Sequence, residues 1–544
     1  MQRFTAYPER DEADNQSALE EMIMDNENVM TMPAPPAVQE VRYDAPKPEI
    51  RKHDGVFVWL ALLLGFMVMR YCFFNTNGFF TTAAFLLTFA CSAAYLLVSG
   101  LRPTARQWVS AGILCVFTSV FSITASGLLH VLCFLFLTAF QFWWVQAVCI
   151  KARFVTRYFG FDLARTVFAQ PFFSFGDAFR AIRAGKGGKH SAAAVTVIAG
   201  IAVTVPLTLI VAVLLSMADE GLNKMFSDIT DHLLEIDLFD LVPQFLFAFP
   251  AGMIIFGMLR AEAKQKLRPL PSDVYYNDRM QRMKKLPGLG VFAGVTPICL
   301  LYLLYVFSQA NYFISAFYGK LPANMAYSEY ARRGFFELCA IAVINLAVIL
   351  FMLAFSKRRA DGHSAALRFY NTALCGFTLF IIATALAKMI MYISEYGLTR
   401  LRLYTAWFMV LLAVIFAVLL IRAFVPKLHT AAIISAAFIA LFGVLCFSRP
   451  DALIAQYNIT QYESGKLDNL DVEMLCGLSD DAYVVMLEHY DTVHGQAFKW
   501  YNNKTDMFDD ELDNRIYNYE CNPFSAYNIS SQKVKALYAA RQNA

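Results

Sequence analysis

Charged residues are scarce in this chain of 544 residues. Asp, Glu, Lys and Arg make up 16% of it and apolar residues 58%, whereas soluble globular domains carry about 25% charged residues. Such a chain has too little charge for the surface of a soluble enzyme. It also lacks the polar composition of a disordered protein and the basic surplus of a nucleic-acid binder. The composition therefore predicts a protein that crosses a membrane many times.

Recognisable catalytic and metal-binding patterns are missing as well. The eight histidines are scattered, and His130 has no His, Cys or carboxylate at metal-ligand spacing. The basic stretch 185–191 resembles a phosphate loop, but a Walker loop needs Ser or Thr directly after its lysine, and here His190 follows Lys189. No nucleophile–base pair stands out. We therefore expect no metal and no bound cofactor, and a membrane enzyme ranks third, behind the two functions given at the end of this section.

Long apolar runs, by contrast, are abundant. A bilayer core of about 30 Å needs roughly 20 apolar residues in a helix, and eleven segments approach that length. The third is short and forms a tight hairpin with the fourth. We predict an all-α polytopic transmembrane helical bundle with a small helical extracytoplasmic module at its C-terminus. The predicted spans are 56–74, 79–99, 108–124, 127–150, 191–217, 241–260, 289–308, 335–355, 369–393, 403–421 and 430–447.

The basic residues between these segments predict the orientation. If the N-terminus lies inside, the cytoplasmic loops carry 24 Lys and Arg and the external loops carry 6. Cytoplasmic loops of membrane proteins carry an excess of Lys and Arg. An odd number of spans then places the C-terminus outside.

Three regions of different charge follow from this topology. Residues 1–54 hold 12 acidic and 6 basic residues, too few apolar groups to fold, and we expect a disordered acidic cytoplasmic tail. Residues 55–447 form the predicted bundle. Residues 448–544, with 15 acidic and 8 basic residues, form the predicted external module. Within it a helix is expected from Pro450 to Gly465, and Asp468, Ser479 and Ser530 are expected to cap three more.

Two cysteines stand apart from the other nine. Nine of the eleven lie in or beside predicted spans, where a thiol behaves as a small apolar group. Cys476 and Cys521 lie in the external module, and a cysteine pair outside the cytosol can be oxidised. We therefore predict a disulfide between them, with two free buried thiols as the alternative.

Four stretches of the chain resemble one known group of proteins. They are 206–226 with its Ala218-Asp219 step, 321–338 with the run Tyr327 to Leu338, 396–402 (Tyr-Gly-Leu-Thr-Arg-Leu-Arg), and 450–482. The last contains Pro450 to Ile459, Gly465 to Asp468 and Leu478 to Ala482. Together they are similar to bacterial integral-membrane proteins of the domain of unknown function four-one-seven-three, or the related four-one-five-three. The resemblance runs from about residue 160 to 500, implies a bacterial plasma membrane and brings no assigned activity.

Charged residues cluster at the predicted external level of the bundle. Ionisable groups in or beside spans are costly and mark functional sites by default, and opposite charges at one depth can pair around an outward-facing polar pocket. We prefer a pair between Glu337 and Lys388. The alternative is structural, because interfacial Lys and Arg extend their charged ends to water. The candidate external polar cluster consists of Arg332, Arg333, Glu337, Lys388, Glu395, Arg400 and Arg402.

Two functions of different classes fit these features. The first is a non-catalytic sensor or scaffold whose external module binds a ligand or a protein partner. The second is a transporter or lipid-handling translocator that uses a polar pocket near the external face. Arg and aromatic residues alternate over 151–184, which favours helices lying in anionic headgroups of the lipid bilayer over nucleic-acid binding. We expect no nucleic-acid partner.

Overall fold

The computed structural model describes most of the membrane helices and the C-terminal module. The chain divides into two units, Met1–Glu49 and Ile50–Ala544, and all described residues lie in the second. The predicted tail up to residue 49, the pair Arg332 and Arg333, and almost all of the predicted span 191–217 lie outside them. The described residues are 50–74, 78–150, 155, 158–184, 204, 208, 211, 215, 217, 221, 238–265, 282–284, 288–308, 335–356, 365–425, 427–494, 507–521 and 528–543.

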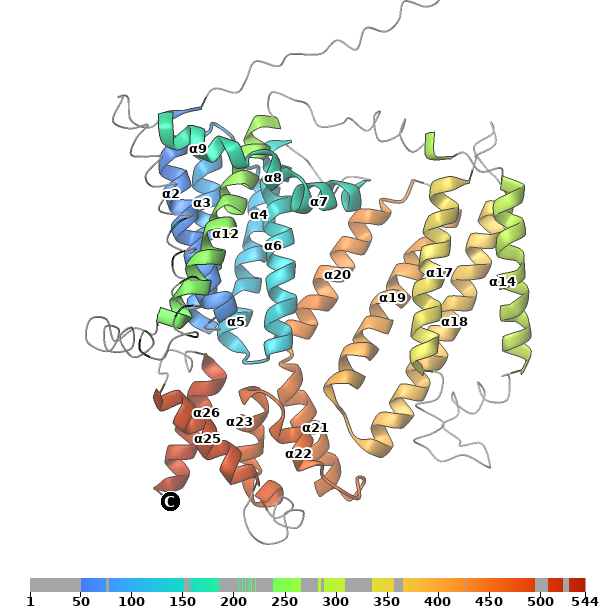
Figure 1. The fold of residues 1–544 in the computed structure, drawn as a ribbon. Coiled ribbons are helices and arrows are strands. Elements are labelled where there is room, and N and C mark those ends of the chain that lie inside the picture. The colour runs from blue at the N-terminus through green and yellow to red at the C-terminus, as the bar shows by residue number, and fades with distance from the viewer. Residues whose placement is uncertain are drawn as a thin grey trace, which may run out of the picture. The chain divides into compact units, whose positions relative to one another are not determined.

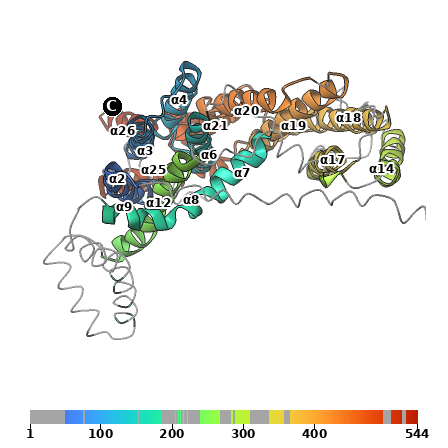
Figure 2. The same ribbon diagram turned by 90° about the horizontal axis from the view of Figure 1, so that it is seen from above.

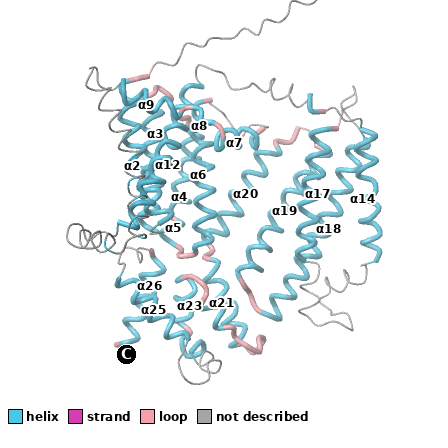
Figure 3. The backbone as a smooth tube through the Cα atoms, viewed as in Figure 1, coloured by secondary structure: helices cyan, strands magenta, loops and turns pink. Residues whose placement is uncertain are grey.

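The described part of the chain is built from helices and contains no strand (Figure 3). In the membrane region the elements are α2 (Lys52–Met69), the π-helical turn η1 (Arg70–Phe74), α3 (Gly78–Val98), α4 (Ala105–Thr118), α5 (Val120–Ile123), α6 (Gly127–Cys149), α7 (Phe159–Phe168), α8 (Gln170–Phe173), α9 (Phe175–Ala184), α12 (Leu238–Gln265), α14 (Gly288–Ser308), α17 (Phe335–Phe355), α18 (Ala365–Tyr396), α19 (Arg400–Phe424) and α20 (Thr430–Phe447). The C-terminal helices are α21 (Pro450–Glu463), α22 (Val472–Cys476), α23 (Asp480–Glu488), α25 (Met507–Cys521) and α26 (Ile529–Gln542).

Ten helical segments among the described residues are long and apolar enough to cross a membrane. They coincide with ten of the eleven predicted spans, which confirms the all-α polytopic fold and makes the chain a multi-pass membrane protein. The short third span is one of them: α4 and α5 together cover Ala105–Ile123. Its start is fixed by a capping box, in which the backbone N–H of Thr104 donates to Gln107 at 2.8 Å.

An N-terminal helix cluster is formed by α2, α3, α4, α5, α6, α9, α12 and α20, which share one apolar core (Figures 1 and 2). Trp144 on α6 is fully buried in this core, and its ring lies edge-on to Phe89 of α3 at 4.7 Å between centroids. Phe442 of α20 stacks on Phe117 of α4. Helix α20, far along the chain, therefore packs against the helices near the start.

Helices α2 and α12 meet backbone to backbone. A Cβ atom placed on Gly65 of α2 would lie 2.4 Å from the backbone nitrogen of Gly252, and one on Gly252 would lie 2.7 Å from the Cα of Leu62. Small residues let membrane helices approach this closely, because association there depends on van der Waals packing rather than on exclusion of water. The two glycines therefore set the distance between these helices.

A C-terminal helix cluster has a separate apolar core contributed by α14, α17, α18 and α19. A buried polar chain crosses it: the Tyr302 hydroxyl donates to Asn345 at 2.6 Å, and Asn345 donates to Thr378 at 2.9 Å. These hydrogen bonds tie α14, α17 and α18 together at a depth where an unpaired polar group would be costly.

The C-terminal module has a third apolar core, drawn mainly from α21 to α26. Its first helix begins at Pro450, and Gly465, with φ of +70°, follows its end, both as predicted. Ser479 does precede α23. Two cap predictions are wrong, because Asp471 accepts the N-terminal hydrogen bond of α22 instead of Asp468, and Asn528 accepts that of α26 instead of Ser530.

The aromatic and basic stretch after α6 forms the short helices α7, α8 and α9. Phe161, Phe168 and Phe172 have exposed side chains on them, while α8 contacts α12 and α9 contacts α2. Exposed phenylalanines on short helices fit the expectation of segments lying in a lipid headgroup layer.

Candidate functional site

Two buried and fully hydrogen-bonded carboxylates lie where the C-terminal module meets the membrane region, near two turns of that region. One of these turns is the α5–α6 turn, residues 124–126, of the N-terminal helix cluster. The other is the α18–α19 turn, residues 397–399, next to the C-terminal helix cluster. We call the contacts between these turns and the module the junction site, and its centre is two fully buried carboxylates, Asp451 and Asp481.

Asp481 binds the α5–α6 turn. It sits in the first turn of α23, and its carboxylate accepts hydrogen bonds from the hydroxyl of Thr124 and the backbone N–H of Ala125. The same carboxylate pairs with Arg449, whose Nη2 lies 3.1 Å away, and accepts from the hydroxyl of Ser530. A buried carboxylate is tolerated only when its lone pairs are filled in this way. One side chain therefore joins α23 and α26 to the end of α5.

Arg449 reaches Asp481 because of an unusual backbone. It follows α20 and precedes Pro450, and it is the one non-glycine residue with positive φ, +51°, among the described residues. A side chain in the left-handed region costs about 1–2 kcal/mol, which the ion pair with Asp481 and the hydrogen bond to Ser530 at 2.9 Å offset. The last membrane helix is thus connected to the module by a strained and paired arginine.

Asp451 binds the start of α19. Arg400 donates from Nε and Nη2 to the two carboxylate oxygens at 2.9 and 2.7 Å, which is the bidentate geometry of the stronger ion pairs. Arg400 also donates to the backbone oxygen of Gly477 at 3.0 Å, and the backbone N–H of Ser479 donates to Asp451 at 3.2 Å. Burial alone would raise the pKa of Asp451, but the hydrogen bonds from Arg400 and Ser479 outweigh it and hold this pKa below its ordinary value.

Asn458 holds the α18–α19 turn by its backbone. Its amide accepts from the N–H of Leu398 and donates to the oxygen of the same residue, both at 2.7 Å. Gly397 precedes Leu398 with φ of +75°, and a Cβ there would lie 2.4 Å from the Asn458 side-chain oxygen. Only glycine meets both demands, the left-handed backbone and the close approach. Arg402 closes the turn by donating to the backbone oxygen of Tyr396 at 2.8 Å.

The module is stiffened behind the junction by Arg515 of α25. Its guanidinium donates to Asp480 at 2.8 Å and to the backbone oxygens of Cys476 and Leu478, and it lies 4.1 Å from the ring centre of Tyr483. Asp480 also accepts from Ser531 of α26. These bonds hold α23, α25 and α26 together.

The predicted cluster residues are distributed over several places. Arg400 and Arg402 lie at the junction site. Lys388 is buried on α18, whereas Glu337 and Glu395 are exposed. Among the described residues no ion pair joins Glu337 to Lys388, and that pairing stays a prediction. Arg332 and Arg333 lie outside the described residues.

Cys476 and Cys521 are free thiols in the structure, the first buried and the second exposed. The disulfide predicted between them is not formed here and stays a prediction. Burial raises the pKa of Cys476 to about 11, so little of this thiol is in the reactive thiolate form at neutral pH.

Sequence reasoning did not single out Asp451, Asp481, Arg449 and Asn458 as functional. Three of them stood inside the stretches that carry the family resemblance, 450–459 and 478–482. In the structure these two stretches and the stretch 396–402 contact one another at the junction site. The sequence feature that could have indicated these residues is the presence of Gly, Arg, Asp and Asn together in the polar turns between helices.

A second buried polar network lies where α2 begins and α12 ends. Asp54 is fully buried and pairs with Arg260 at 3.0 Å, while the hydroxyl of Tyr95 donates to it at 3.1 Å. Asp177 of α9 lies 3.8 Å from Arg260. This network fixes the ends of α2, α9 and α12. No group of three or more His, Cys, Asp or Glu among the described residues could hold a metal.

Comparison with known proteins gives one match. The model of the family described as Domain of unknown function (DUF4153) matches residues 109–489, which includes the α5–α6 turn, the α18–α19 turn, α21 and α23. No curated protein and no solved structure matches the chain.

Proposed function

Since this chain belongs to the domain of unknown function family DUF4153, we propose its function from the junction site: it is a non-catalytic sensor or scaffold of the bacterial plasma membrane. Its C-terminal module lies outside the cell membrane, binds a ligand or protein partner, and passes that event to the bundle. The observation that carries the proposal is that two buried carboxylates of one module, Asp481 and Asp451, bind the α5–α6 turn and the start of α19, which belong to two different helix clusters.

The energetics of the junction support a relay over a loose tether. Each buried carboxylate has several donors from separate elements, and breaking a buried pair costs about 3–5 kcal/mol. A ligand that binds the module can change the conformation of the bundle only if some contacts between module and bundle differ between two conformations of the protein. Asp481 and Asp451 are the contacts through which we propose this change to pass, because Asp481 joins the module to the α5–α6 turn and Asp451 joins it to the start of α19.

The outward orientation is supported by the excess of Lys and Arg in the loops that are then cytoplasmic, 24 against 6. Exposed apolar side chains on the module, Leu453 and Tyr517 among them, provide surface for a partner. Nothing in the composition favours a nucleic acid as that partner.

Photocrosslinking in intact bacteria tests this function. The photoreactive residue benzoylphenylalanine replaces Tyr517, which is 66% exposed, or Leu453, which is 45% exposed, and Tyr519, which is 7% exposed on the same helix as Tyr517, serves as the matched control. The proposal predicts a discrete protein or ligand adduct from position 517 or 453 and none from 519. It also predicts that the adduct weakens when Asp481→Asn is added. The absence of adducts at both exposed positions in well-expressed protein would reject a sensor or scaffold role for the module.

A further inference from the structure

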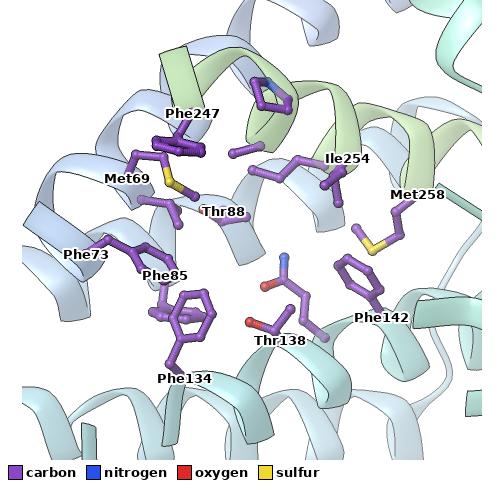
Figure 4. A pocket seen from close by; sticks show the side chains of 15 residues that line it. Met69, Phe73, Phe85, Thr88, Phe134, Thr138, Phe142, Phe247, Ile254 and Met258 are labelled. Atoms are coloured by element: carbon purple, nitrogen blue, oxygen red, sulfur yellow. The ribbon is translucent and has the colours of Figure 1, made fainter. Parts of the chain in front are cut away.

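A cavity of about 350 Å³ lies inside the N-terminal helix cluster, between α2, η1, α3, α6 and α12. Small-molecule sites in proteins occupy roughly 300–1,000 Å³ and are mainly apolar, so this cavity falls at the small end of that range. Figure 4 shows Phe134, Thr138 and Phe142 of α6 on one side and Phe247, Ile254 and Met258 of α12 on the other. All four long helices around it are candidate membrane spans.

The cavity results from two local departures from regular helix packing. Gly65 and Gly252 bring α2 and α12 into backbone contact, and Pro250, two residues before Gly252 on α12, lines the cavity. A proline inside a helix removes one backbone hydrogen bond and bends the helix. Helix α2 ends in the π-helical turn Arg70–Phe74, and such wide turns often occur at functional sites. Phe73 of this turn lines the same cavity.

Two polar side chains of the wall, Gln141 and Thr88, donate hydrogen bonds to groups that do not line the cavity. Gln141 donates to Ser92 at 3.0 Å, and Thr88 donates to the backbone oxygen of Ala84 at 2.7 Å. The wall therefore offers an occupant mainly methyl, methylene and aromatic surface. A water-soluble polar ligand would gain little there, whereas a hydrocarbon chain would recover the dispersion contacts that the lining atoms otherwise lack.

One cation, Arg70, lies next to the cavity in the chain without lining it, and its guanidinium is 5.9 Å from the ring centre of Tyr71. Arg70 follows the lining residue Met69, and its Nη1 donates to Gln244 at 3.0 Å, one turn before the lining residue Phe247. The guanidinium has five N–H donors, and among the described residues no carboxylate pairs with Arg70. An anionic oxygen group beside Arg70 would accept hydrogen bonds from the guanidinium and balance its charge. Guanidinium and phosphate form strong paired hydrogen bonds.

We propose that this cavity binds one acyl chain of a membrane glycerophospholipid, whose phosphate is held by Arg70. The hydrocarbon specificity comes from the apolar wall and from the position of the cavity between candidate spans, and the phosphate specificity comes from Arg70 next to the lining residue Met69. This site is separate from the junction site and does not depend on the sensor proposal.

Photolabelling of the full chain in vesicles tests the proposal. The vesicles consist of phosphatidylethanolamine with a minor fraction of phosphatidylglycerol that carries a diazirine in one acyl chain, and a matched diacylglycerol probe lacks the phosphate. Peptide mapping is expected to place the label on α6 and α12 near Thr138 and Ile254. Thr138→Phe fills the cavity and should lower this labelling about tenfold. Leu135→Phe, on the exposed side of α6, is the matched control and should leave it unchanged.

The phosphate contact has its own comparison. Arg70→Gln should lower labelling by the phosphatidylglycerol probe and leave labelling by the diacylglycerol probe unchanged, with Arg102→Gln, an exposed arginine, as the control. In the wild-type protein, unlabelled phosphatidylglycerol should compete better than unlabelled diacylglycerol, a result independent of how the variants fold. Labelling that Thr138→Phe does not lower would overturn the acyl-chain site. Equal competition by the two unlabelled lipids would overturn its phosphate specificity.

Discussion

At the scale of single residues, the junction site depends on contacts that tolerate little change. Gly397 has a positive φ, and the Asn458 side chain lies so close to it that a Cβ at this position would collide with the Asn458 oxygen. Asp451 has to stay ionised inside the protein. Both requirements can be tested with a change of one residue.

Gly397→Ala is expected to destabilise the protein by about 2 kcal/mol or more, because the left-handed backbone costs about 1–2 kcal/mol with a Cβ and the methyl group displaces Asn458. Gly465→Ala is the matched control, since Gly465 has φ of +70° but nothing within 4 Å of the added Cβ. Thermal unfolding of both variants in detergent measures the difference. Equal losses for the two variants would mean that the contact with Asn458 contributes nothing.

The ionised state of Asp451 predicts a dependence on pH. Its pKa in the folded protein lies below the ordinary value, which is about 3.9 for Asp. Its contribution to stability is therefore fully present above about pH 5 and is lost as the pH falls through the folded pKa. The difference in unfolding free energy between the wild type and Asp451→Asn should shrink between pH 5 and pH 3. A difference that stays constant over this range would contradict an ionised Asp451.

At the scale of helices, close packing and buried pairs fix how the elements meet. The α2–α12 crossing has no room for side chains at Gly65 and Gly252, and the pair Asp54–Arg260 holds the far ends of the same helices. The acyl-chain cavity lies beside this crossing, so its shape depends on the same two helices.

Gly252→Leu should separate α2 from α12 and destabilise the bundle by about 3 kcal/mol or more, since a side chain inserted into backbone contact exceeds ordinary overpacking of about 1–3 kcal/mol. Gly112→Leu on α4 is the control, because nothing lies within 4 Å of a Cβ there. The readouts are elution on gel filtration and the midpoint of thermal unfolding. If both variants behave like the wild type, the backbone contact does not hold these helices.

The sequence was sufficient for the helices that cross the membrane, because their length and apolar composition are dictated locally by the bilayer. It was sufficient for α21 as well, since Pro450 and Gly465 mark its ends. It was not sufficient for Asp54, which reads as the end of an acidic tail yet pairs with Arg260 more than 200 residues later. The same holds for Asp481 and Thr124. Pairing partners so distant in the chain depend on the tertiary arrangement, which local patterns do not contain.

At the scale of the whole molecule, orientation and coupling are the two properties on which the proposed function rests. Cys521 is the exposed cysteine among the described residues, whereas Cys476 of the same module is buried. This contrast makes the position of the module measurable with a reagent that does not cross the membrane.

A membrane-impermeant maleimide should label Cys521 in intact cells, and Cys521→Ser should remove that label. Labelling that requires a reductant would show that Cys521 is held in a disulfide, as the sequence predicts with Cys476. Labelling only after the cells are broken open, with or without reductant, would place the module inside and refute the proposed orientation.

Coupling between the two turns is the property that separates a relay from a module fixed at two independent points. Hydrogen exchange of the full chain measures it, with Asp481→Asn compared with Asp468→Asn, an exposed aspartate of the same module. Asp481 contacts the α5–α6 turn, while the amide of Leu398 in the α18–α19 turn is bonded to Asn458 instead. The relay predicts that Asp481→Asn speeds exchange at Leu398 about tenfold, equivalent to about 1.4 kcal/mol, whereas Asp468→Asn does not. Faster exchange confined to residues 124–126 would show that the two turns are held independently and that the module relays nothing.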